Sequence, residues 1–249
     1  MSIDSCAGVV CDIDGVLWIG GQPGVGAREF VADLARGGYP CVLLTNDCSI
    51  SQSARRQELL DAGFLASGWQ LISASGLIAD HLVAQQFRTV CVLGCPTAFL
   101  PRSVSVTTDP AAAEAVVVGD CFRSFDVGAV GAALSALERG VPFIAAQRNA
   151  TWSDGLHTHP DNGFFVAGLE YCAGRVATIL GKPEAAAYRA ALRRIGCKAQ
   201  DALFISDSGT EIDAAAELGF HTVHFTSTQQ FSDALALADS LQEVRRCVA

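Results

Sequence analysis

The amino-acid sequence predicts an α/β protein built on a doubly wound parallel sheet. Short apolar runs alternate with longer amphipathic segments, which is the pattern of repeated strand–helix units. Glycine follows many of the helical segments, where a left-handed C-cap ends a helix. Polar motifs directly follow three of the apolar runs, at the sheet edge where such proteins bind ligands.

Each element is predicted from its own stretch of sequence. The apolar runs are short enough to be buried strands, and the segments between them have the spacing of amphipathic helices. The expected strands are 8–11, 41–44, 89–93, 115–118, 142–145, 202–205 and 221–225. The expected helices are 27–36, 51–62, 75–86, 126–138, 184–195, 211–218 and 232–239.

The domain organisation is inferred from the acidic motifs. The 249 residues lie between the length of one large domain and that of two modest ones. Acidic motifs occur near both ends, at Asp12 and Asp207, and they must converge if they form one site. We therefore expect a discontinuous catalytic core of residues 1–74 and 180–249, with an α/β insertion at residues 75–179.

The composition excludes several classes of protein. Half of the residues are hydrophobic and 17% are charged, which excludes a disordered chain. No apolar run approaches the roughly 18 residues of a membrane-spanning helix, and the N-terminus lacks the features of a signal peptide. The net charge of −9 argues against nucleic-acid binding through a basic face. We expect a cytoplasmic, soluble protein without membrane or nucleic-acid partners.

The ten cysteines form neither a metal-binding nor a disulfide pattern. Most lie inside apolar runs, where a thiol behaves as a small hydrophobic side chain. We expect structural thiols, as is usual in reducing cytosol.

The first motif is the sequence Asp12-Ile13-Asp14-Gly15, which directly follows an apolar run. Alternation along a strand points the two carboxylates in similar directions, and Gly15 allows a tight turn. Two close carboxylates repel, so the pair needs a proton or a cation. With an ordinary pKa of about 3.9, Asp12 is expected to be ionised. Taken alone, the motif is also consistent with a solvated turn.

Three further motifs are weaker individually. Thr45 and Asn46 end a strand and suit phosphate oxygens, but also a helix cap. Lys182 precedes a proline and suits an anion, but also a surface turn. Asp207 ends a strand and Glu211 follows in a helix start, where an acid can simply complement the helix dipole.

In this order the four motifs resemble those of the haloacid dehalogenase (HAD) superfamily of aspartyl-phosphate-forming hydrolases. The stretches VCDIDGVLW, GGQPGVGAREFVADLARGGYPCVLLTND and LEYCAGRVATILGKP resemble its class IIA branch. That branch includes enzymes of the p-nitrophenyl phosphatase, pyridoxal phosphatase and phosphoglycolate phosphatase types. The resemblance covers essentially the whole chain, and implies a Rossmann-like core with residues 75–179 as an α/β cap that governs substrate specificity.

The resemblance also implies catalytic roles for the two carboxylates of the first motif. Asp12 is expected to be the nucleophile and Asp14 the general acid/base. Mg²⁺ is expected on the carboxylates of Asp12 and Asp207 and the backbone carbonyl of Asp14. The charge count supports a cation, because four acidic side chains and a phosphate ester cannot share a site without positive charge.

Further roles follow from the same resemblance. Thr45, Asn46 and Lys182 are expected to bind the phosphoryl group, while Glu211 steadies the metal waters or the lysine. The sequence departs from the family at Asp47, where a second Asn is usual. It also has Ser206 for the usual glycine before Asp207, and Glu211 for the usual aspartate.

The substrate contacts of the cap are the weakest part of the resemblance, because QRNATW departs from the usual TNPD-like stretch. Arg148, Asn149, His157 and His159 are candidates for contact with a polar or anionic substrate group. A metal at the two histidines is a less favoured alternative. The resemblance further implies that the cap could form a homodimer.

The expected function is Mg²⁺-dependent hydrolysis of a small-molecule phosphate monoester of the sugar, glycerol, glycolate or pyridoxal phosphate type. A phosphotransferase and a catalytically weak phosphate-binding relative are alternatives. A haloacid dehalogenase is disfavoured, because halide departure needs neither a general acid nor Mg²⁺.

Overall fold

The computed structural model describes residues 8–94, 100–121, 126–153 and 156–248. Contacts divide the chain into two compact units. The first unit consists of residues 1–45, 55–72 and 182–249, and the second of residues 46–54 and 73–181. Each unit is described by itself.

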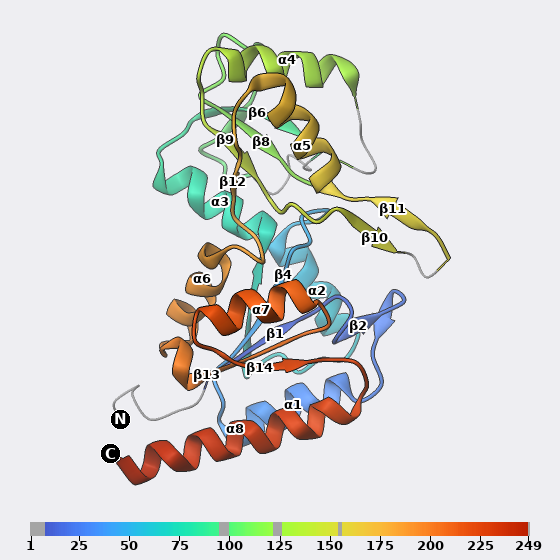
Figure 1. Ribbon diagram of the computed structural model, residues 1–249, viewed down its shortest axis with the longest axis vertical. Helices are drawn as coiled ribbons and strands as arrows, with labels where there is room; N and C mark the ends of the chain where they lie inside the picture. The colour runs from blue at the N-terminus through green and yellow to red at the C-terminus, as the bar shows by residue number, and fades with distance from the viewer. Residues whose placement is uncertain (1–7, 95–99, 122–125, 154–155, 249) are drawn as a thin grey trace. The chain divides into compact units, whose positions relative to one another are not determined.

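The first unit contains a five-stranded sheet (Figure 1). Strand β1 lies at its centre, between β13 and β4, and pairs with both in parallel. Strand β14 pairs in parallel with β13. The strand order is β14 (His221–His224), β13 (Ala202–Ser206), β1 (Gly8–Asp12), β4 (Cys41–Thr45), β5 (Trp69–Ser73). A short antiparallel hairpin of β2 (Trp18–Ile19) and β3 (Gln22–Pro23) follows β1.

Helices cover both faces of this sheet (Figure 1). Helices α1 (Ala27–Gly37) and α8 (Gln229–Val248) lie on one face, where Cys11 and Ile205 join one hydrophobic cluster. Helices α6 (Ala185–Ile195) and α7 (Gly209–Glu217) lie on the other. Because side chains alternate along a strand, Asp12 and Ser206 point away from the α1–α8 cluster. Helix α2 (Gln52–Asp61) adds the buried Leu59 to that cluster.

The second unit contains its own five-stranded sheet. Neighbouring strands of this sheet pair in parallel. Helix α4 packs on β6 and β8 and against α5 (Figure 1), while α3 contributes to a second hydrophobic cluster. The strand order is β12 (Thr178–Ile179), β9 (Phe143–Ala145), β8 (Ala115–Val118), β6 (Thr89–Leu93), β7 (Ser105–Val106). The helices are α3 (Ala74–Ala84), α4 (Val127–Glu138) and α5 (Asn162–Ala173), and β10 (Thr151–Ser153) pairs with β11 (Thr158–Pro160) in an antiparallel hairpin.

The α/β fold class is confirmed, and every expected strand and helix is present. Strands β6 and β8 have the expected bounds, and the other expected elements have shifted ends. Strand β5 and helix α5 were not predicted, and neither were the strands of two or three residues β2, β3, β7, β10, β11 and β12. Helix α5 contains Gly163 and Gly168, which lower helical propensity, while its N-cap Asp161 and αL Gly174 define its ends. The last helix runs to Val248, well beyond the predicted 232–239.

The chain passes between the two units at positions close to the expected boundaries. The chain enters the second unit at Ser73 and leaves it at Gly181, where the sequence suggested Ala74 and Leu180. The segment 46–54 also belongs to the second unit, although the sequence assigned it to the core. Its Gln52 side chain accepts a hydrogen bond from the Ser73 backbone N–H (3.0 Å).

The thiols of Cys11, Cys41 and Cys91 lie buried in strands. Burial raises the pKa of Cys41 to about 12, so this thiol is protonated and behaves as a hydrophobic side chain. No helix in the described part of the chain is long and apolar enough to cross a membrane.

The packing around Gly181, the last residue of the second unit, can be tested by substitution. A Cβ there would lie 2.5 Å from the Ala146 carbonyl oxygen and 2.5 Å from Asn46 Oδ1. We expect Gly181→Ala to lower the free energy of unfolding by about 1–3 kcal/mol, measured by urea denaturation. The matched control is Gly131→Ala in the exposed face of α4, where a Cβ meets nothing and should stabilise by about 0.5–1 kcal/mol. Equal effects of the two changes would contradict this packing.

Candidate active site

The polar residues expected at the strand ends are assembled within the first unit around Asp12, the last residue of β1. Asp12 is only 5% exposed, and the Ile13 backbone N–H donates to its Oδ1 (2.7 Å). Gly15 adopts a φ of 88°, which favours glycine. A Cβ at Gly15 would lie 2.0 Å from Asp207 Oδ2, so the Asp207 carboxylate lies directly against the turn that follows β1.

Lys182 forms the electrostatic centre of this site. Its ammonium nitrogen lies 2.5 Å from Asp12 Oδ1 and 2.9 Å from Glu211 Oε2, and the residue is 1% exposed. Burial alone would lower the pKa of Lys182, but the two carboxylates outweigh it and raise the pKa above its ordinary value. Lys182 is therefore a permanent buried cation between two acids.

Thr45 and Asp14 are also brought together. The Thr45 hydroxyl donates to Asp14 Oδ2 (2.8 Å), which links the end of β4 to the first motif. Asp14 is exposed, in contrast to Asp12. The second carboxylate of the motif is thus open to solvent.

Asn46 and Asp47 belong to the second unit. Asn46 Oδ1 lies beside the backbone of Gly181. The carboxylate of Asp47 accepts hydrogen bonds from the backbone N–H (2.9 Å) and hydroxyl (2.6 Å) of Ser49. This local turn accounts for the acidic residue where the family usually has Asn, because its charge has donors two residues away.

The charges of the site do not balance. Partial burial raises the pKa of Asp207, and the charges of Glu211 and Asp14 add to this effect, while Lys182 opposes it. Burial likewise raises the pKa of Asp12 well above its ordinary value, despite the opposing charge of Lys182. Burial of Asp12 and its ion pair with Lys182 therefore act on its pKa in opposite directions, and the expected ionised state of Asp12 stays a prediction.

A divalent cation fits this donor set. In the described residues no group of three or more His, Cys, Asp or Glu side chains is arranged to hold a metal. The carboxylates of Asp12 and Asp207 and the backbone carbonyl of Asp14 would leave further positions for water and substrate oxygen. Such partial protein ligation by oxygen is characteristic of Mg²⁺.

Two buried residues of the site were not assigned roles from the sequence. Ser206 ends β13, and its hydroxyl lies 2.8 Å from Glu211 Oε2 and 3.2 Å from Asp12 Oδ2. Tyr188 on α6 donates to the backbone carbonyl of Glu211 (3.0 Å). The alternation of β13 indicates that Ser206 and Phe204 share a face, but no sequence pattern identifies their partners.

The four candidate substrate residues of the cap all lie in the second unit. Arg148 forms an ion pair with Glu170 of α5. The Asn149 backbone N–H donates to the side chain of Gln147 (2.5 Å). His159 stacks on Trp152 (ring centroids 4.6 Å apart), and His157 lies 6.2 Å from His159.

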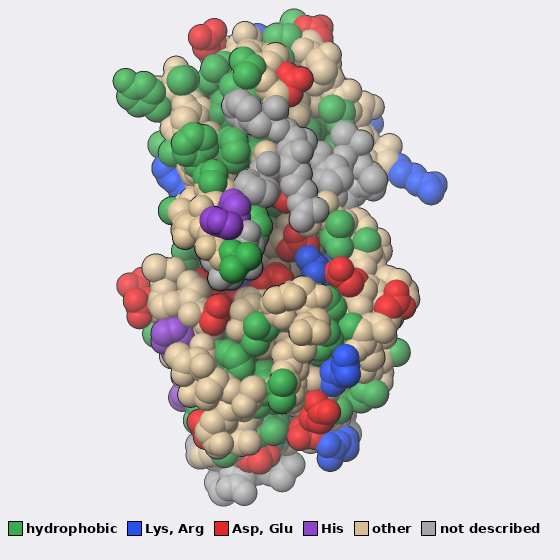
Figure 2. All heavy atoms as spheres, turned by 90° about the vertical axis from the view of Figure 1, so that its right-hand side faces the viewer, with side chains coloured by type: hydrophobic (Ala, Val, Ile, Leu, Met, Phe, Trp, Pro, Cys, Tyr) green, Lys and Arg blue, Asp and Glu red, His purple; other side chains and the backbone are tan. Residues whose placement is uncertain are grey.

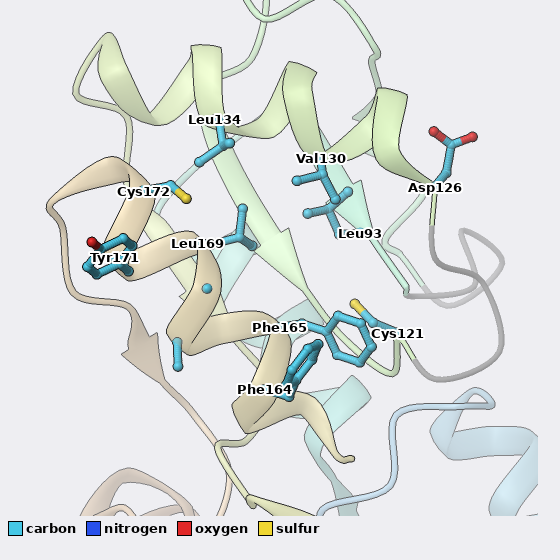
Figure 3. A pocket seen from close by; sticks show the side chains of 12 residues that line it. Leu93, Cys121, Asp126, Val130, Leu134, Phe164, Phe165, Leu169, Tyr171 and Cys172 are labelled. Carbon is cyan, nitrogen blue, oxygen red and sulfur yellow. The ribbon is translucent and has the colours of Figure 1, made fainter. Parts of the chain in front are cut away.

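A separate apolar cavity of about 530 Å³ lies in the second unit between α4 and α5. Figure 3 shows Val130 and Leu134 of α4 facing Leu169 of α5, with Leu93 beside them. None of the predicted catalytic or substrate-contacting residues lines it. The predicted chemistry and this cavity are therefore distinct features of the chain.

The surface agrees with the acidic composition. On the face drawn in Figure 2, basic side chains are scattered among acidic and uncharged ones and form no continuous patch.

Two family models match the chain. One, described as haloacid dehalogenase-like hydrolase, matches residues 9–99, and the other, described as HAD-hydrolase-like, matches residues 179–242. The ribonucleotide monophosphatase NagD of Escherichia coli (strain K12) is 28% identical over 218 residues, which are 86% of this chain and 85% of NagD.

Solved structures share the fold. NagD from E. coli K-12 matches with a TM-score of 0.77 at 26% identity, over 91% of both chains. The p-nitrophenyl phosphatase from Archaeoglobus fulgidus matches in fold with a TM-score of 0.81 at 20% identity, over 98% of this chain and 99% of that chain. The glycerol phosphate phosphatase Rv1692 from Mycobacterium tuberculosis, in complex with magnesium, matches with a TM-score of 0.73 at 25% identity, over 88% of this chain and 67% of that chain.

The matched segments contain all of the core motifs: 9–99 includes Asp12, Asp14 and Thr45, and 179–242 includes Lys182, Asp207 and Glu211. The chain belongs to the haloacid dehalogenase superfamily of hydrolases, in the class IIA branch that its motifs indicated.

Proposed function

We propose that this protein is a Mg²⁺-dependent phosphatase that hydrolyses a small-molecule phosphate monoester through an aspartyl-phosphate intermediate. The observation that carries the proposal is the buried Asp12 carboxylate, held by Lys182 and the Ile13 N–H, with Asp14 two residues away and Asp207 against Gly15. The names of the relatives support phosphate monoesters with alcohol leaving groups, such as ribonucleotides and glycerol phosphate.

Asp12 attacks the phosphorus atom, and the bond from phosphorus to the ester oxygen breaks. Asp14, protonated for this step, gives its proton to the departing alkoxide. Asp14 is then a carboxylate and takes a proton from the water that attacks the phosphorus of the aspartyl-phosphate. Inorganic phosphate leaves, and the Asp12 carboxylate and the protonated Asp14 are restored.

The positive charge of the site serves both steps. Lys182 is fixed beside Asp12 Oδ1 and offsets negative charge on the nucleophile and the transferring group. Thr45, bonded to Asp14, presents its hydroxyl at the same strand edge for a phosphoryl oxygen. When bound, Mg²⁺ supplies electrostatic stabilisation of the phosphoryl oxygens and keeps Asp12 ionised. Glu211 holds Lys182 in place.

The proposal favours phosphoryl transfer over dehalogenation. Expulsion of halide requires neither a proton donor nor Mg²⁺, so it would give no role to Asp14 as an acid or to Asp207 as a metal ligand. Transfer to an acceptor other than water is the remaining alternative within this chemistry. It is distinguished by the accumulation of a phosphorylated acceptor in place of inorganic phosphate.

The nucleophile is tested by phosphate release from p-nitrophenyl phosphate. We expect Mg²⁺-dependent turnover in the wild type and a loss of at least about three orders of magnitude in Asp12→Asn. The matched control is Asp47→Asn, which restores the residue usual in the family and retains turnover. Phosphate release by Asp12→Asn at the wild-type rate would contradict the aspartyl-phosphate mechanism.

The general acid is tested by the leaving group. We expect Asp14→Asn to lower kcat/KM by about 10²–10⁴-fold for an alkyl phosphate, but by about tenfold or less for p-nitrophenyl phosphate, whose leaving group needs little protonation. Because kcat/KM reports the first transfer, the later role of Asp14 as base does not obscure the comparison. Equal losses on both substrates would exclude Asp14 as the acid.

The cation is tested by thermal unfolding without substrate. The raised pKa of Asp207 means that its carboxylate form is disfavoured in the fold, so its stabilising contribution is present at acid pH and is lost as pH rises through that pKa. Mg²⁺ binds the carboxylate form and competes with protons. We therefore expect Mg²⁺ to raise Tm more at neutral than at acid pH, and Asp207→Asn to abolish most of the gain. A gain that is independent of pH and of Asp207 would contradict this site.

A further inference from the structure

A closed ring of polar contacts joins three charged side chains to one serine. Lys182 bridges Asp12 Oδ1 and Glu211 Oε2, and the Ser206 hydroxyl bridges Glu211 Oε2 (2.8 Å) and Asp12 Oδ2 (3.2 Å). Ser206 is completely buried. Its hydroxyl also accepts a hydrogen bond from the Ser208 backbone N–H (3.1 Å).

The two oxygens of Asp12 are held differently. Oδ1 accepts from the Lys182 ammonium and the Ile13 N–H. Contacts at one oxygen leave the carboxylate free to turn about the bond that joins it to Cβ. A contact at Oδ2 fixes the plane of the group, and the Ser206 hydroxyl makes such a contact (3.2 Å).

The backbone aims the serine at this position. Cys11 of β1 pairs with Ile205 of β13, so the residues that follow them, Asp12 and Ser206, end adjacent parallel strands. Both point to the same face by strand alternation. The Ser208 N–H occupies an acceptor position of the hydroxyl, which leaves its single proton for the two carboxylates.

We propose that Ser206 is a positioning residue, whose hydroxyl fixes the orientation of the Asp12 carboxylate and ties it to Glu211. This proposal rests on the proposed function, since it assigns a role toward the nucleophile of that reaction. The Ser206 hydroxyl stays protonated throughout, and only the acceptor of its hydrogen bond changes. It donates to Glu211 while Asp12 carries the phosphoryl group, and it donates to both carboxylates again once the Asp12 carboxylate is regenerated. A glycine here, which is usual in the family, has no side chain to do this.

The test compares Ser206→Ala with the matched control Ser208→Ala. The Ser208 hydroxyl belongs to the same loop but lies against Thr210 Oγ1 (3.0 Å) and has no role in the ring. Oriented ligand groups lose about 10–100-fold when their hydrogen-bond partners are removed, so we expect Ser206→Ala to lower kcat for p-nitrophenyl phosphate by about that factor. We expect the KM and the inhibition constant of inorganic phosphate to change by about twofold or less, because orientation rather than binding is lost.

Rescue separates the hydroxyl from the side-chain volume. Ser206→Thr retains the hydroxyl and should recover part of the lost kcat, while Ser206→Gly should resemble Ser206→Ala. Wild-type kcat in Ser206→Ala and Ser206→Gly would overturn the proposal. So would a loss of phosphate affinity parallel to the loss of kcat, or a Ser206→Thr variant that folds and is no faster than Ser206→Ala.

A measurement without turnover keeps the proposal separate from the proposed function. In EDTA, the fall in Tm caused by Ser206→Ala is compared in the wild type and in Asp12→Ala. If the serine holds Asp12, the fall becomes about half as large or less once the carboxylate is gone, since contacting residues are not additive. Additive effects would overturn the contact itself. Absence of turnover in the wild type, with coupling retained, would count against the phosphatase and not against the positioning contact.

Discussion

The site depends on one interaction, the placement of the Lys182 ammonium between Asp12 and Glu211. A buried ammonium without these partners would lose its charge, and either carboxylate without the lysine would be left unpaired in the interior. Removing one member of such a group costs about 3–5 kcal/mol, although replacing the whole group by apolar residues can be harmless. Stability alone therefore does not explain the arrangement, whereas the proposed catalytic role does.

The parallel sheet places the members of this cluster side by side. Asp12 and Ser206 end neighbouring strands, and Lys182 lies just before α6, which packs on the same sheet. Glu211 lies in the first turn of α7, where a negative charge also complements the helix dipole. Segments that are nearly two hundred residues apart in sequence thus meet because parallel strands deliver their ends to one edge.

The cluster is incomplete as a set of charges. One buried ammonium faces Asp12 and Glu211 directly, with Asp14 and Asp207 close to the same turn. The raised pKa values of Asp12 and Asp207 express this excess of negative charge together with burial. A bound cation would offset this excess of negative charge and allow an anionic substrate to enter. Hydrophobic contacts on both faces of the sheet hold the charged residues in place.

The sequence allowed the fold class, most strands of both sheets and the acidic core of the site to be predicted, because short apolar runs and strand-end polar residues are local patterns. Strand β5 and the two-residue strands β7 and β12 were not predicted. It did not reveal helix α5, whose glycines weaken the helical pattern, or the membership of segment 46–54 in the second unit, which depends on contacts such as that of Gln52 with Ser73. The burial that opposes ionisation of Asp12 was not predicted, because a reference pKa describes an exposed side chain. The partners of Ser206 depend on strand register, which residue types alone do not specify. The cap contacts of Arg148, Asn149, His157 and His159 with substrate, and a homodimer through the cap, stay predictions.

The most direct test of the central claim is chemical identification of the phosphorylated residue. The protein is incubated with p-nitrophenyl phosphate and Mg²⁺, quenched during turnover and treated with borohydride, which reduces an acyl phosphate to an alcohol. Peptide mass spectrometry should then find Asp12 converted to homoserine, and Asp14, two residues away, unchanged. Turnover with no modification at Asp12, or with the modification at Asp14 or another residue, would contradict the assignment of Asp12 as the nucleophile.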